Sequence, residues 1–150
     1  MFQPLPADLR PLVFAECELV LDLLHQLQSC YPIDVESIII LLCINDATMR
    51  PFMQDADAAS EYFLPERLPE DVRGGISRIM IADKTGLPRE TVRRKCQNRL
   101  KHGYIEIDWD NCLRARPDLR NAGLQRLIET GHQAVRYLIR LRSLGIAADY

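Results

Sequence analysis

The chain has 150 residues, 47% of them apolar, which is enough for one compact domain (1–150) with a packed core. Its longest apolar run, residues 38–44, is far shorter than the ~18 residues that a membrane-spanning helix needs. No cationic segment followed by an apolar run opens the chain, so no export signal is predicted. We therefore expect a soluble cytoplasmic protein without a membrane partner.

The net charge of −2 is distributed unevenly along the chain. Residues 1–72 contain thirteen acidic and three basic side chains, a net charge of −10. Residues 73–102 contain nine basic and two acidic side chains, a net charge of +7, and residues 103–150 carry +1. A slightly acidic protein can bind nucleic acid through such a block, because binding depends on the local potential.

The first predicted element is a long amphipathic helix over residues 8–29, where leucines and valines recur at three- and four-residue steps. Tyr31-Pro32 ends it, and Asp34 is the predicted N-cap of a strongly apolar helix over residues 35–47. Arg50-Pro51 is expected to end this second helix.

Next come a short helix predicted over residues 55–64 and a connection, "LPERLPEDVRGG", which contains two prolines and two glycines. Asp55, Asp57 and Glu61 resemble a metal-binding carboxylate cluster, but the glycine and distal ligand of a calcium loop are missing. We therefore expect no metal site and a solvated surface here.

The basic block begins with a short helical pattern, "ISRIMIADKTG", with Gly86 at the position of a C-cap. Pro88 suits the first turn of a second helix, predicted over residues 88–102. In that helix Val92, Cys96 and Leu100 recur at four-residue steps and form the expected core stripe. Gly103 ends the helix.

A β-hairpin is predicted to follow, with strands at residues 104–109 and 112–116 joined by a turn at Asp110-Asn111. The last element is a helix over residues 119–143, in which Gly131 is a candidate break or bend. The expected fold class is mainly α with a small β-hairpin.

Residues 75–102 satisfy the steric demands of a helix-turn-helix. Ala82 is small where the two helices approach most closely, and Gly86 allows the left-handed turn. Leu87 fills the junction, and Val92 holds the second helix in the core. The motif places its second helix in the major groove of DNA.

This pattern resembles the DNA-binding motif of bacterial regulators. The stretch "TVRRKCQNRLKHGYIEI" looks like the recognition helix and first wing strand of winged-helix families such as MarR and GntR. The family usually has an aliphatic residue where Arg99 stands, and the connection over residues 48–74 is longer than usual. The resemblance implies a winged-helix core over residues 34–116, with the helix-turn-helix at 75–102 and the wing at 104–116.

The resemblance also implies a transcriptional regulator that binds double-stranded DNA. The expected DNA-binding residues of the second helix include Pro88 and five residues expected to read bases, namely Arg89, Glu90, Arg93, Arg94 and Gln97. The residues expected to hold phosphates are Arg78, Thr91, Lys101, Arg114 and Arg116. The flanking helices at 8–29 and 119–143 have more apolar surface than this core can cover, so a homodimer is expected. Whether a small-molecule effector also binds is left open.

Two less specific interpretations stay open. Arg94 and Glu90 stand at i and i+4, so the basic helix could have an ordinary solvated face with a surface ion pair. Alternatively, the winged helix could be a protein-interaction module that does not bind DNA specifically. Basic residues clustered on the second helix favour DNA.

No catalytic set or bound cofactor is predicted. His25, His102 and His132 stand apart from any serine, cysteine or carboxylate at a catalytic spacing, so we expect no enzyme activity. The five cysteines lack zinc-ligand spacing. We interpret them as reduced, small, buried apolar residues, with a redox sensor as the alternative.

Overall fold

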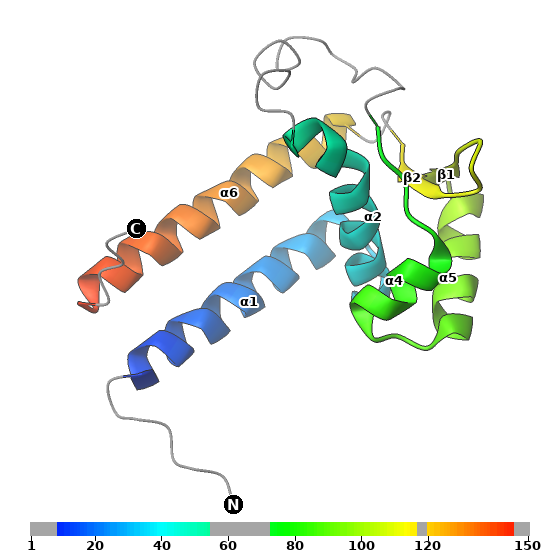
Figure 1. Cartoon of the computed structure of the whole chain (residues 1–150). Helices are drawn as coiled ribbons and strands as arrows, with labels where there is room; N and C mark the ends of the chain where they lie inside the picture. The colour runs from blue at the N-terminus through cyan, green and yellow to red at the C-terminus, as the bar shows by residue number, and fades with distance from the viewer. Residues whose placement is uncertain (1–8, 55–72, 117–119, 146–150) are drawn as a thin grey trace, which may run out of the picture. The chain divides into compact units, whose positions relative to one another are not determined.

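The structure is a computed structural model that describes residues 9–54, 73–116 and 120–145, without the side chains of residues 30, 52, 53 and 120–130 (Figure 1). The helix expected over 55–64 and most of the connection after it lie outside the described residues. Contacts within the chain divide it into two compact units, residues 1–32 with 120–150 and residues 33–119. The expected 34–116 core falls inside the second unit; whether the chain behaves as a single domain stays a prediction.

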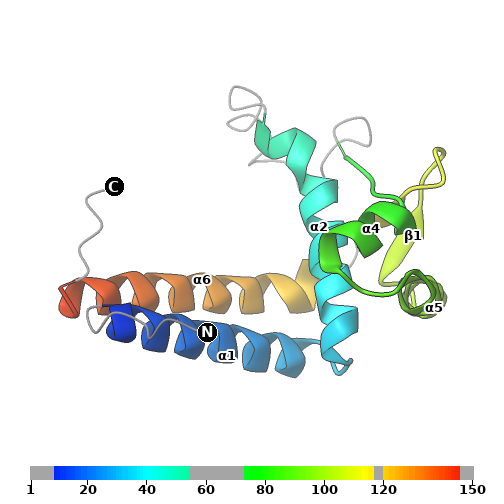
Figure 2. The same cartoon turned by 60° about the horizontal axis from the view of Figure 1, so that its bottom comes forward.

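The first unit is a pair of antiparallel helices, α1 (Arg10–Cys30) and α6 (Arg120–Ser143), which lie side by side (Figures 1 and 2). Ala15 is buried, and Arg140 of α6 lies over the ring of Phe14 and 2.9 Å from a carboxylate oxygen of Glu18. Helix α6 continues through Gly131 without a break. Both helices lie close to their predicted bounds.

The second unit begins with α2 (Val35–Gln54). Asp34 caps this helix as predicted, because one carboxylate oxygen accepts the Ser37 backbone N–H at 3.0 Å and the other accepts the Ser37 hydroxyl at 2.9 Å. The prediction that Arg50-Pro51 ends the helix was wrong. Pro51 removes only the N–H that would bond the Ala47 carbonyl, and that carbonyl lies against Gly74, where a Cβ would come within 2.3 Å.

The helices α4 (Arg78–Thr85) and α5 (Arg89–Lys101) follow, joined by a short turn. Ser77 caps α4 by accepting the Met80 N–H at 3.2 Å, and Gly86 ends it with φ of 71°. The Gly86 N–H bonds the Ala82 carbonyl at 2.9 Å, which satisfies one of the last carbonyls of the helix. The predicted C-cap at Gly86 is confirmed.

A hairpin of β1 (Ile105–Ile107) and β2 (Leu113–Ala115) completes the unit. The strands pair antiparallel, with Ile105 opposite Ala115 and Ile107 opposite Leu113. The expected two-residue turn was wrong: residues 109–111 form a three-residue loop, closed by the Asp108 N–H on the Cys112 carbonyl at 2.9 Å. Asn111 has φ of 59°, the left-handed residue that such loops require. The fold class, mainly α with a small hairpin, is confirmed.

One apolar cluster holds these elements together. Every described helix and strand of the second unit contributes, and the buried members are Ile40, Ile44, Ile76, Ile81, Ala82, Val92, Cys96, Ile105 and Leu113. Ile76 also exchanges backbone hydrogen bonds with Leu113 at 2.8 and 3.0 Å, so the segment before α4 lies along β2. Among the described residues, no helix is both long and apolar enough to cross a membrane.

Candidate nucleic-acid interface

Helix α5 is fixed to the second unit by its inner face. Val92 and Cys96 are fully buried, as the stripe predicted. The third buried position is Arg99 rather than Leu100, which is only half-buried. The Arg99 guanidinium lies 5.4 Å from the centroid of the Tyr104 ring, so an aromatic face accepts the cation where an aliphatic residue was expected.

The opposite face of α5 is exposed and cationic. We define the α5 outer face as the exposed residues Arg89, Glu90, Arg93, Arg94, Gln97, Asn98 and Lys101. The last five line a shallow hollow of about 410 Å³. Sequence reasoning omitted Asn98, although its position one turn after Arg94 is a detectable signal. The α5 outer face has four cations and a single acid, Glu90, so the electrostatic potential of this face is positive.

Glu90 pairs with a different arginine from the one expected. Arg93 Nε donates to Glu90 Oε2 at 2.8 Å and Arg93 Nη2 donates to Oε1 at 2.7 Å. The hydrogen bonds from Arg93 lower the pKa of Glu90, and Glu90 raises the pKa of Arg93. The i, i+4 pair of Glu90 with Arg94 does not form; among the described residues, no hydrogen bond or ion pair of Arg94 is found.

Lys95 belongs to the basic run of α5 but turns away from the outer face. Its ammonium nitrogen lies 2.5 Å from a carboxylate oxygen of Asp34 and 3.0 Å from one of Glu36, and its side chain is 13% exposed. Desolvation by burial raises the pKa of Asp34, but hydrogen bonds from Lys95 and Ser37 outweigh it and hold that pKa well below its usual range. Lys95 therefore ties α5 to the start of α2.

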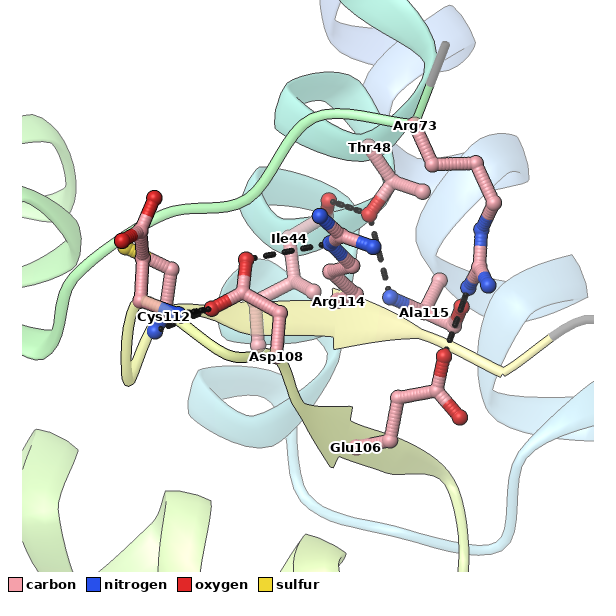
Figure 3. A network of polar contacts seen from close by, with 9 residues as sticks. Ile44, Thr48, Arg73, Glu106, Asp108, Cys112, Arg114 and Ala115 are labelled. Carbon is pink, nitrogen blue, oxygen red and sulfur yellow. Dashed lines mark hydrogen bonds and ion pairs between the residues drawn. The ribbon is translucent and has the colours of Figure 1, made fainter. Parts of the chain in front are cut away.

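Arg114 was expected to hold a phosphate, but its side chain lies inside the second unit and not on its surface. Arg114 is buried, and its Nε lies 3.1 Å from Asp108 Oδ2 (Figure 3). Asp108 Oδ1 accepts the backbone N–H groups of Asp110 at 2.9 Å and Cys112 at 2.8 Å. At Gly75, a Cβ would come within 2.6 Å of Asp108 Oδ2, so glycine leaves room for this pair.

A second buried arginine, Arg73, joins the segment before α4 to the hairpin, and Thr48 joins the hairpin to α2 (Figure 3). Arg73 donates to the Ala115 carbonyl and lies 2.9 Å from Glu106 Oε1, with its side chain 4% exposed. The Thr48 hydroxyl donates to the Ile44 carbonyl at 2.8 Å and accepts the Ala115 N–H at 3.0 Å. These contacts fix how the hairpin lies within the second unit.

The tip of the hairpin has an exposed apolar surface. Trp109 is 85% exposed and occupies the loop itself, rather than the end of the first strand as expected. Ile107 is also exposed. Of the cations expected on the wing, Arg116 is exposed and Arg114 is not.

The other expected contact residues have varied surroundings. Pro88 is exposed at the start of α5, whereas Thr91 and Arg78 are half-buried. His25, His102 and His132 are all exposed, and no group of histidine, cysteine and carboxylate side chains in the described part of the chain could hold a metal ion.

The cysteines are less uniform than expected. Cys96 is buried and Cys43 and Cys112 are half-buried, but Cys17 is exposed on α1, so its predicted burial was wrong. The exposed Cys17 lies on the same face of α1 as Val13 and Val20, which are exposed too.

Comparison of the chain with protein-family models, with curated proteins and with solved structures gives no match.

Proposed function

We propose that this chain is a winged-helix transcriptional regulator that binds double-stranded DNA in the cytoplasm, with α5 in the major groove. The α5 outer face carries this proposal: four exposed cations and two exposed amides project from a helix whose opposite side is anchored by the buried Val92, Cys96 and Arg99. A major groove ~12 Å wide admits a helix, and arginine and amide side chains are the usual readers of base edges.

The order of the elements supports the winged-helix interpretation. The order is α2, then the segment at Ile76 that pairs with Leu113 of β2, then α4, α5, β1 and β2. The tight turn at Gly86 sets α4 beside α5, and both contribute to one core. In a helix-turn-helix, such a first helix supports the second while the second contacts DNA.

The positions of the side chains refine the expected roles. Arg89, Arg93, Arg94 and Gln97 are the proposed readers of bases, because each is exposed on the outer face. Lys101 and Arg116 are the proposed phosphate contacts, with half-buried Arg78 and Thr91 as weaker candidates. Arg114 leaves this set, because its burial against Asp108 gives it a structural role.

Binding is tested with the full chain and labelled duplexes by fluorescence anisotropy at several salt concentrations. A pool of random duplexes should bind at low salt, and selection from it should enrich one site. Lys101→Ala should weaken all duplexes and reduce the salt slope by about one unit, whereas Arg94→Ala should chiefly reduce preference for the selected site. Arg142→Ala, an exposed arginine on α6, is the matched control. No binding to any duplex at low salt would refute the proposal.

The proposed regulator acts as a homodimer through the helices of the first unit. Among the described side chains of α1 and α6, six apolar ones are more than half exposed, namely Phe14, Val20, Leu21, Val135, Leu138 and Ile139. Val135, Leu138 and Ile139 share one face of α6. Burying such a surface against a second copy is favourable by about 25 cal/mol per Å². Light scattering should report twice the chain mass of 17.2 kDa, and a mass of one chain at micromolar concentration would refute the dimer.

A protein-interaction module is the second candidate, and the exposed Trp109 with its neighbour Ile107 favours it. Tryptophan is enriched at the centres of protein interfaces. This candidate predicts that the full chain binds no duplex at any salt concentration. A small-molecule effector stays a prediction.

A further inference from the structure

We propose that Glu90 is a positioning residue that holds Arg93 in the orientation needed to read a guanine in the major groove. This inference rests on the proposed DNA-binding function and assigns a base and a mechanism to one position of the α5 outer face.

The two hydrogen bonds between these residues use only one edge of the guanidinium. Arginine has five N–H donors in a rigid plane. Glu90 accepts from Nε and Nη2, at 2.8 and 2.7 Å, on the side edge. The end edge, between Nη1 and Nη2, keeps a pair of parallel N–H donors. A pair of this kind can donate two hydrogen bonds to one base.

Guanine fits this pair of donors. In the major groove it presents two acceptors, N7 and O6, side by side. Adenine presents N7 beside an amino group, so one of the two donors would face another donor. Arg93 held with its end edge outward is therefore selective for guanine, and a freely rotating arginine would lose more conformational entropy to make the same contact.

The position of the pair on the helix agrees with this role. Glu90 is in the first turn of α5, where the partial positive charge of the helix end favours a carboxylate. Recognition helices contact bases chiefly through their first residues. Both side chains are well exposed, at 72% for Glu90 and 62% for Arg93, so the free edge is accessible.

A carboxylate at a DNA-facing surface also has a cost, which makes its presence informative. Glu90 repels phosphates and lowers the affinity for every duplex. If Glu90 were only a solvated surface residue, its removal would strengthen binding to all sequences equally. If it positions Arg93, its removal reduces discrimination at one base pair.

The experiment starts from the site selected by the full chain, with each base pair replaced in turn. Affinities are measured for the unmodified protein, Glu90→Gln, Arg93→Ala and the double variant. The glutamine keeps the shape of the side chain but has one oxygen, so the two-bond arrangement is lost. Glu16→Gln removes the same charge from an exposed position on α1 and is the matched control. Circular dichroism checks that each variant folds.

We expect the unmodified protein to prefer guanine at one position by about 5- to 150-fold. Arg93→Ala should abolish that preference, Glu90→Gln should reduce it at least about threefold, and the two changes together should do no more than Arg93→Ala alone. Glu16→Gln should leave it unchanged. An unchanged guanine preference in Glu90→Gln would overturn the inference while leaving the proposed function intact. If Glu90→Gln removed a preference for cytosine, and did so in the Arg93→Ala background as well, Glu90 would read a base directly. That result would also overturn the inference. If no duplex binds, the proposed DNA-binding function is refuted, and the inference that rests on it is refuted with it.

Discussion

The buried pair of Asp108 and Arg114 allows a quantitative prediction of stability. Replacing Asp108 with alanine leaves the Arg114 guanidinium buried without its carboxylate, since the two side chains are only 5% and 10% exposed. It also removes the acceptor of the Asp110 and Cys112 N–H groups. Breaking a buried ion pair by removing one partner costs about 3–5 kcal/mol. That is a large part of the ~5–15 kcal/mol by which a domain is stable.

Urea denaturation followed by far-ultraviolet circular dichroism measures this effect. With a typical urea dependence of ~1–3 kcal/mol per molar, the midpoint of Asp108→Ala should fall by at least about 1 M. Asp110→Ala is the matched control, because Asp110 is an exposed aspartate in the same loop and its loss should change stability by no more than about 0.5 kcal/mol.

A compensating variant separates a lost charge pair from general damage to the hairpin. Arg114→Met combined with Asp108→Ala removes both charges and keeps an apolar side chain in the buried site, so it should recover part of the stability. If Asp108→Ala costs no more than Asp110→Ala, the pair contributes little and Arg114 returns to the set of candidate phosphate contacts.

Three further predictions concern other residues. If the hairpin tip approaches the DNA backbone, saturating duplex should shift the emission of Trp109, the only tryptophan, which is 85% exposed; unchanged spectra would show that the tip stays clear. Asp34→Ala should lower the free energy of unfolding by about 1 kcal/mol at pH 7. Because the folded state lowers the pKa of Asp34, its contribution is present above pH ~4 and lost as the pH falls, so unfolding curves of this variant and the unmodified chain should converge in acid. Burial raises the pKa of Cys96 to about 11, so a maleimide at pH 8 should label Cys96 only after urea is added, and rapid labelling of the folded protein would contradict its burial.

The order and approximate bounds of the helices and of the hairpin could be predicted from the sequence, because local features specify them. Asp34 caps α2, and Gly86 ends α4 in the left-handed conformation. The period of Val92 and Cys96 identified the buried side of α5. The predicted end of α2 at Pro51 was wrong because a proline near the end of a helix removes only one hydrogen bond. Gly74 packs against the carbonyl that this proline leaves without its helical partner, and the local sequence gives no sign of that contact.

The roles of the individual cations depended on tertiary structure. Composition placed nine basic residues in a block of thirty, and the helical period directed Arg89, Arg94 and Lys101 outward. The same reasoning could not show that Arg114 meets Asp108 across the hairpin or that Lys95 reaches Asp34, which is 61 residues earlier in the chain. A charged side chain is buried only where distant segments bring it a partner, and that partner has no fixed spacing in sequence. The sequence therefore determined where positive charge accumulates, whereas long-range packing decided which of these cations remain on the surface to meet a ligand.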